Sequence, residues 1–158
     1  MAFNIPSIAG QDDPLLGFRF AISFLGSSGV DFPLDFRFQS VSGFSVAVEV
    51  SKVGGAGNNK TGLPLPQRLE YPNLVLKRGM PLASSLRQEI MDNFDDFEFK
   101  LRNVLLSILD ESGQPASTWL FQDAYVTRWS LSGIDATASG VVIEEMELSY
   151  LNFKSFSL

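Results

Sequence analysis

Apolar and polar positions alternate along most of the chain. In the stretch 17–25, Phe18, Phe20, Ile22 and Phe24 fall on one side of an extended backbone, and smaller or polar residues fall on the other. A period of two with aromatic residues is typical of a half-buried β-strand. Similar patterns predict further strands in the segments 36–51, 69–76, 97–102, 119–129 and 141–153.

The segment 141–153 has two clearly different faces. One face is expected to be buried, and the other is expected to meet water. Glu144 falls on the apolar side, so we expect it near a strand end or paired with a cation, with Arg78 and Lys77 as candidates. The apolar face consists of Val142, Met146, Leu148 and Tyr150, and the polar face of Glu145, Glu147 and Ser149.

A helical period occurs in one segment. Apolar residues recur there at every fourth position, and the residues between them are mostly polar. A serine at position 84 or 85 is a suitable N-cap. The pattern predicts a helix at about Ser84–Phe94, with an apolar face made of Leu82, Leu86, Ile90 and Phe94.

Two segments carry signs of irregular backbone. Residues 1–16 contain prolines and acidic residues and predict an N-terminal arm. Residues 52–66 are rich in glycine, asparagine and proline and predict a long extended loop or a loose hairpin. No linker or repeat divides the chain, so residues 1–158 are expected to form one domain. The predicted class is mainly β (α+β), a sandwich or barrel-like unit of six to seven strands with one flanking helix.

Composition excludes several kinds of chemistry. The 158 residues contain no Cys and no His, which excludes disulfides, thiolate catalysis and His-based triads. A net charge of −6 argues against a nucleic-acid-binding face. The 14 Phe residues and a mean hydropathy of +0.11 predict a very aromatic core or a surface covered by a partner. We see neither a signal peptide nor a membrane helix, and we expect synthesis in the cytoplasm.

Three patterns in the sequence resemble chemical sites, and each also has a simpler explanation. Residues 54–61 nearly match the phosphate-binding G-x-x-x-x-G-K-[ST] loop, but Asn59 replaces the required second glycine, and the prolines that follow oppose a helix. Paired carboxylates are expected to be solvated charges. Aromatic residues could stack on a sugar, although core or interface roles are commoner. The carboxylate pairs are Asp12-Asp13, Asp95-Asp96 and Glu144-Glu145, and the aromatic residues are Tyr71, Trp119, Tyr125, Trp129 and Tyr150.

An ordered set of segments resembles a known family. The segments are 38–44, the Gly-rich loop ending at Leu63-Pro64, 71–79, Trp129 and 143–150. In this order they resemble the tail-tube proteins of contractile phage tails and extracellular contractile injection systems, which are similar in fold to the Hcp tube protein of type VI secretion. One departure is the segment 90–94, where phage-like members often have a Trp. The residues that carry the resemblance most directly are Val41, Gly43, Phe44, Tyr71, Leu76, Arg78, Gly79, Trp129, Leu148 and Tyr150.

The resemblance implies a structural role without catalytic residues, cofactor or metal. It implies a subunit that forms homohexameric rings, which stack into an inner tube around a lumen able to conduct protein cargo. The implied partners are further copies of the chain, a contractile sheath protein, baseplate or spike proteins and a tube terminator, with no nucleic acid. The implied final location is a phage tail or a released injection particle.

The segment 52–66 is also predicted to be an assembly element. Its length and apolar end are difficult to explain in an isolated domain. Glycines would supply the backbone freedom to reach a neighbouring subunit, and the apolar end would dock there. The residues concerned are Gly54, Gly55, Gly57, Leu63, Pro64, Leu65 and Pro66.

Two alternatives stay open at the level of sequence. A tube-initiator or baseplate paralogue would share the same fold. A carbohydrate-binding β-sandwich module would use the aromatic residues on an exposed face. A hydrolase is weaker still, because His and Cys are absent.

Overall fold

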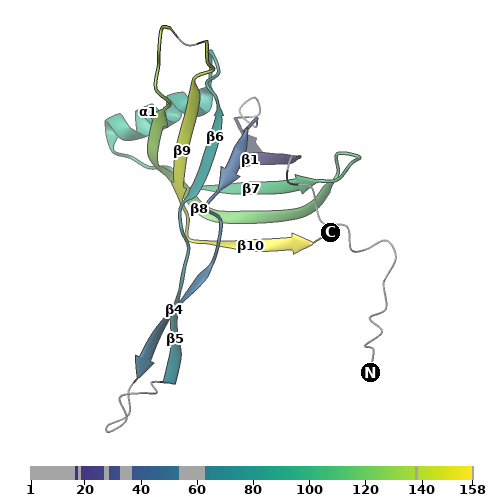
Figure 1. The fold of residues 1–158 in the computed structure, drawn as a ribbon, viewed down its shortest axis with the longest axis vertical. Helices are drawn as coiled ribbons and strands as arrows, with labels where there is room; N and C mark the ends of the chain where they lie inside the picture. The colour runs from purple at the N-terminus through teal and green to yellow at the C-terminus, as the bar shows by residue number, and fades with distance from the viewer. Residues whose placement is uncertain are drawn as a thin grey trace.

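The computed structural model describes residues 17, 19–26, 29–32, 37–53, 63–137 and 139–157. Within them it contains ten strands and one helix (Figure 1), which confirms the mainly β class. The N-terminal arm, residues 1–16, lies outside the described residues. The elements are β1 (Phe20–Gly26), β2 (Gly29–Asp31), β3 (Ser40–Ser42), β4 (Ala47–Val53), β5 (Leu63–Glu70), β6 (Leu74–Gly79), α1 (Ser85–Asp96), β7 (Arg102–Leu109), β8 (Pro115–Leu131), β9 (Ile143–Ser149) and β10 (Asn152–Ser157).

The predicted count of six to seven strands was too low. The long segment 36–51 is divided into β3 and β4 at Gly43, whose φ of +82° lies in the left-handed region. A Cβ at this position would collide with the backbone oxygen of Asn73. The segment containing Pro72 is likewise divided, into β5 and β6. The short β2 has too few residues for alternation to be recognised.

Two antiparallel sheets share the 17-residue strand β8. The first half of β8 pairs with β7 on one side and with β10 on the other, which builds the sheet β2-β1-β7-β8-β10. The second half pairs with β9 and continues the order β8-β9-β6-β3. Asp123, with a φ of 52°, and a register shift between Val126 and Arg128 mark the change from one sheet to the other.

The core lies between these sheets. On β9, Met146 and Leu148 are fully buried and Tyr150 just beyond it is 8% exposed, as predicted, while Val142 is half-buried. Glu145, Glu147 and Ser149 are partly exposed on the opposite face. The core therefore follows from strand alternation on both sheets. Its other apolar members are Ile22, Phe24, Leu74, Leu76, Leu86, Ile90, Val104, Leu106, Phe121 and Ala124.

Helix α1 lies where the sequence predicts it, and its N-cap is Ser84, one of the two predicted candidates. The Ser84 hydroxyl accepts a hydrogen bond from the Arg87 backbone N–H at 3.1 Å, and Leu86 and Ile90 are buried. The predicted apolar face was wrong at its ends. Leu82 precedes the helix and is fully exposed, and Phe94 is 36% exposed.

We expect Leu148→Ala to lower the free energy of unfolding by about 2–5 kcal/mol, because it opens a cavity in a fully buried site. Chemical denaturation monitored by circular dichroism measures this loss. A loss below about 0.5 kcal/mol, a value typical of surface sites, would contradict the assignment of this face to the core.

The predicted loop 52–66 is in part a hairpin. Strands β4 and β5 pair from Ala47↔Glu70 to Val53↔Leu63, and they continue the register of the β3–β6 pair beyond Gly43. Prolines suggest a loop, but they are tolerated in a strand whose outer edge has no partner. Leu63, Pro64, Leu65 and Pro66 are therefore strand residues, whereas Gly54, Gly55 and Gly57 lie outside the described residues.

Candidate functional site

The second sheet has two open lateral edges within the described residues. Strand β3 pairs only with β6, and beyond Ala124 strand β8 pairs only with β9. Each edge exposes backbone N–H and C=O groups that another strand can bind. The first sheet likewise ends at two edge strands, β2 and β10. Such edges are assembly sites when a neighbouring copy covers them.

The β4–β5 hairpin projects from the body of the molecule (Figure 1). One of its faces is apolar and exposed: Val46, Val48 and Val50 are 49–51% exposed and Leu69 is 54% exposed. Val48 lies directly opposite Leu69. A two-stranded hairpin cannot bury such a face by itself. The apolar face therefore requires a surface elsewhere to cover it.

The other face of the hairpin is held by polar contacts. Arg68 forms ion pairs with Glu49 at 2.5 Å and with Glu70 at 3.5 Å. The Gln67 side-chain amide donates to the Ser51 hydroxyl at 2.9 Å. These cross-strand contacts stabilise the pairing of β4 with β5. Closer to the tip, this face also carries Leu65, which lies opposite Ser51 and is 41% exposed, and Leu63, which is 66% exposed.

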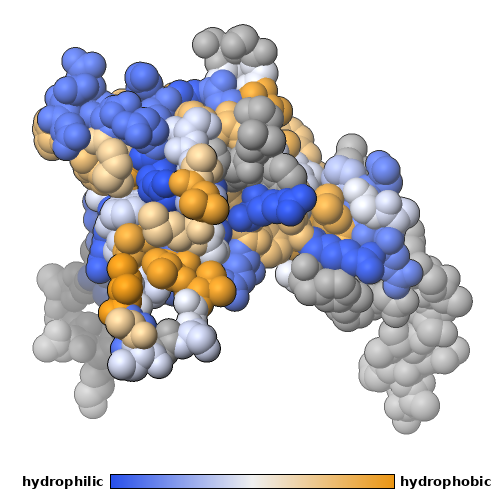
Figure 2. Space-filling view, turned by 90° about the horizontal axis from the view of Figure 1, so that it is seen from above, coloured by the Kyte–Doolittle hydropathy of each residue, from blue (hydrophilic) through white to orange (hydrophobic). Residues whose placement is uncertain are grey.

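A second exposed apolar patch lies at the opposite end of the long axis. It is formed by two segments, the connection between β8 and β9 and the residues that follow β6. The backbone N–H of Met80 donates a hydrogen bond to the carbonyl oxygen of Val142 and so joins these segments. Figure 2 looks onto this end and shows hydrophobic surface there. We call it the end patch; it consists of Met80, Leu82, Ile134 and Val141, which are 40%, 105%, 78% and 76% exposed.

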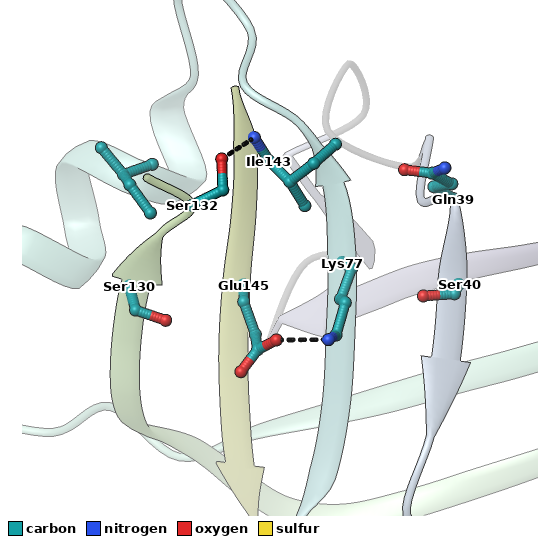
Figure 3. A pocket seen from close by; sticks show the side chains of 8 residues that line it. Gln39, Ser40, Lys77, Ser130, Ser132, Ile143 and Glu145 are labelled. Atoms are coloured by element: carbon teal, nitrogen blue, oxygen red, sulfur yellow. Dashed lines mark hydrogen bonds and ion pairs between the residues drawn. The ribbon is translucent and has the colours of Figure 1, made fainter. Parts of the chain in front are cut away.

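The outer face of the second sheet is hollowed. A depression of about 580 Å³ crosses all four strands, from β8 to β3 (Figure 3). Lys77 and Glu145 face each other in it at 2.6 Å. Its other lining residues are Gln39, Ser40, Ser130, Leu131, Ser132 and Ile143.

A buried ion pair lies beneath this face. Arg78 and Glu144 are 3% and 0% exposed, and their Nε and Oε2 atoms are 2.6 Å apart. Trp129 Nε1 donates to the other carboxylate oxygen at 2.7 Å, and Arg78 donates to the N-cap hydroxyl of Ser84 at 2.7 Å. Of the two cations predicted as partners of Glu144, Arg78 is therefore the one that pairs with it. Lys77 pairs with Glu145 instead. This network joins β6, β8 and β9 to the helix.

The remaining residues of the resemblance are structural. Gly79 ends β6, and Leu76 and Leu148 are core residues. Phe44 and Tyr71 pack at the junction where the hairpin leaves the body, and Val41 packs against the core. Tyr150 lies in the same aromatic cluster, and burial, followed by the nearby Tyr71, raises the pKa of its phenol. These residues form the core around which the exposed surfaces are arranged.

The structure gives little support to the other chemical sites. Glu144 and Glu145 lie on opposite faces of β9, and Asp95 and Asp96 are exposed at the end of α1. Asp12-Asp13 and the phosphate-loop resemblance lie outside the described residues, and the segment that follows the loop is a strand. No group of acidic side chains in the described part of the chain could hold a metal ion. The helix is not long and apolar enough to cross a membrane.

The aromatic residues do not form a sugar-binding platform. Trp119 packs on Phe44 with ring centroids 5.3 Å apart, Trp129 binds Glu144, and Tyr150 is buried. The apolar face of the hairpin and the end patch were not predicted from the sequence. The alternation of valines at 46, 48 and 50 was the available signal, but alternation alone does not show that such a face lacks a partner.

Comparisons with known proteins agree with this architecture. The family described as "T4-like virus tail tube protein gp19" matches residues 16–154. A chain in the cryo-EM structure of the anti-feeding prophage (AFP) baseplate, 6-fold symmetrised, is 30% identical over 92% of this chain and 97% of that chain, with a TM-score of 0.83. No curated protein sequence matches the chain.

More distant structures share the fold. A chain of the PVC sheath-tube complex in its extended state has a TM-score of 0.74 at 19% identity, over 94% of this chain and 95% of that chain. Hcp1 from Flavobacterium johnsoniae has a TM-score of 0.52 at 13% identity, over 89% of this chain and 100% of that chain. The family match covers most of the sequence and includes both sheets and the hairpin. The chain therefore belongs to the T4-like virus tail tube protein family, and its role is that of a structural tube protein.

Proposed function

We propose that six copies of this chain close into a ring and that the rings stack into the inner tube of a contractile injection particle. The observation that carries the proposal is the pair of open edges on the second sheet, in a chain of the tail tube family. If β3 of one copy pairs with the second half of β8 of the next, the sheets join around the ring. A head-to-tail interface of this kind closes when the rotation between copies closes.

Stacking would use the two ends of the molecule. The projecting hairpin and the end patch lie at opposite ends of the long axis (Figure 1). Both are apolar, and both would be covered if one ring rested on the next. The segment 52–66 would then act as an assembly element, with its described strand residues crossing the boundary between rings.

Partners and cargo belong to the same proposal. Solved structures with this fold come from a baseplate, a tube-terminating cap and a sheath-tube complex. They support a sheath protein, a baseplate and a terminator as the partners of the tube. Protein cargo would travel in the lumen, and the assembled particle would act outside the cell that makes it.

The test is the size of the purified protein over a concentration series. We expect species of at least six times 17.4 kDa by light scattering, and rings or tubes in negative-stain micrographs. A monomer at every concentration, even after mixing with a preformed baseplate to nucleate assembly, would overturn the proposal.

A tube-initiating ring at the baseplate is the second candidate. It is favoured by the identity of 30% to a chain of a baseplate structure, compared with 19% to a chain of a sheath-tube complex. Micrographs separate the two functions. A tube subunit forms stacks of many rings, whereas an initiator stops at one ring or a few rings and seeds the growth of another protein.

A further inference from the structure

Two prolines occupy alternate positions of β5, in the part of the projecting hairpin that lies farthest from the body (Figure 1). Pro64 lies opposite Lys52, and Pro66 lies opposite Val50. Residues two apart in a strand point their backbone N–H and C=O groups toward the same side of the strand. Both prolines therefore face one edge of β5, either the edge that pairs with β4 or the outer edge.

The pairing with β4 identifies that edge. In an antiparallel ladder every second residue pair exchanges two hydrogen bonds, and the pairs between them point their backbone groups outward. Proline has no N–H to donate, so the hydrogen-bonded pairs here are those made by Leu63 and Leu65. The outer edge of β5 therefore carries carbonyl oxygens at Pro64 and Pro66 but no N–H donor.

The outer edge of β4 is complete by comparison. Val50 and Lys52 face the two prolines in pairs that exchange no hydrogen bonds, so their own N–H and C=O groups point away from β5. Within the described residues, β4 pairs only with β5. The hairpin can therefore accept a further strand along β4, whereas the prolines prevent this along β5.

This part of the hairpin has few other features that hinder strand addition. Leu63 is 66% exposed and Leu65 is 41% exposed. In the paired segments 50–53 and 63–66 the charged residue is Lys52. Exposed apolar segments with open edges readily pair with copies of themselves. Nearer the body, ion pairs and a register shift already interrupt the edge, so the prolines stand where these features are absent.

Growth of one hairpin on another needs two different edges, β4 of one copy and β5 of the next, and such a head-to-tail contact repeats from copy to copy. Two β4 edges could join only two copies, because both β5 edges of that pair stay closed. We propose that Pro64 and Pro66 determine the specificity of self-association, by closing the β5 edge of one copy to the β4 edge of another. The hairpins then stay separate, and their side-chain faces remain free to contact other surfaces. The inference applies to the separated subunit and does not depend on ring formation.

The test restores the missing donors. Pro64→Val combined with Pro66→Val returns two outward N–H groups to β5; we call this the proline variant. Leu63→Val combined with Leu65→Val is the matched control, because it adds the same number of valines to the same strand at positions whose N–H groups face β4. Thioflavin T fluorescence and electron micrographs of the full chain measure association through strand edges.

We expect the proline variant to raise thioflavin T fluorescence by about tenfold or more over the parent protein and to form fibrils or irregular ribbons. The leucine variant should stay close to the parent. Circular dichroism of fresh, dilute samples should give the parent spectrum for both variants, since the changes lie outside the core. Equal fluorescence for the two variants would overturn the proposal.

A third substitution separates edge pairing from misfolding or general stickiness. Lys52→Pro, added to the proline variant, closes the β4 edge instead, so it should return the fluorescence to the level of the parent. Lys52→Ala in the same background removes the same side chain but keeps the N–H, so the fluorescence should stay high. Failure of Lys52→Pro to suppress association, or equal suppression by Lys52→Ala, would show that association does not run through the hairpin edges.

Ring formation is measured separately, in micrographs of the parent protein. If the parent forms no rings, the proposed function fails, and the comparison among the hairpin variants still decides the role of the prolines. If rings form and restoring the donors has no effect on association, the proposed function stands and the inference about the prolines is wrong.

Discussion

Replacing Glu144 with glutamine is expected to lower the free energy of unfolding by about 3–5 kcal/mol, because it removes the negative charge that pairs with the buried Arg78 guanidinium. Both side chains are nearly inaccessible to water, and their atoms approach to 2.6 Å. The amide keeps the volume of the side chain, so the loss reports electrostatics rather than a cavity. Urea denaturation followed by circular dichroism measures it.

The neighbouring residue provides the control. Glu145 forms the same kind of pair with Lys77 on the opposite face, where the two side chains are 28% and 44% exposed. Glu145→Gln should cost about 0–1 kcal/mol, since solvent screens an exposed pair. Equal losses for the two variants would show that the buried network of Arg78, Glu144 and Trp129 contributes no more than a surface ion pair.

The second large effect is expected on assembly. Val48→Lys places a charge on the apolar face of the hairpin, and we expect it to abolish rings or tubes at concentrations at which the parent protein forms them. The free energy of unfolding of the domain should stay within about 0.5 kcal/mol of that of the parent protein, because Val48 is 50% exposed in the separated subunit. Light scattering and circular dichroism measure the two properties.

Ala47→Lys is the matched control for this variant. Ala47 is also exposed and lies on the other face of the same strand, opposite Glu70. A lysine there meets carboxylates rather than a docking surface, so assembly should be retained. Loss of assembly in both variants would indicate that the hairpin tolerates no added charge, and loss in neither would remove its apolar face from the interface.

Local patterns predicted much of the fold. The helix and its cap were predicted because capping and helical spacing depend on residues within one or two turns. The buried face of β9 was predicted because alternation depends on neighbouring positions in one strand. The tail tube family was indicated by an ordered set of segments, and its match over residues 16–154 confirms that interpretation.

Other features depend on which strands lie beside each other. Lys77 and Arg78 were equal candidates for Glu144, and the pairing of β6 with β9 decided between them by placing Arg78 on the inner face and Lys77 on the outer face. Prolines at 64 and 66 suggested a loop, but the pairing of β5 with β4 makes them residues of a hairpin strand.

The sequence by itself determined the β class, the helix, the core face of β9 and the absence of Cys and His chemistry, because each depends on composition or on near neighbours. The tertiary structure alone decided that, among the residues it describes, one apolar face of the hairpin is exposed, the second sheet has two open edges and its outer face is hollow. These properties arise from cross-strand register and sheet curvature, which join residues far apart in the chain and leave little periodic signal in the sequence.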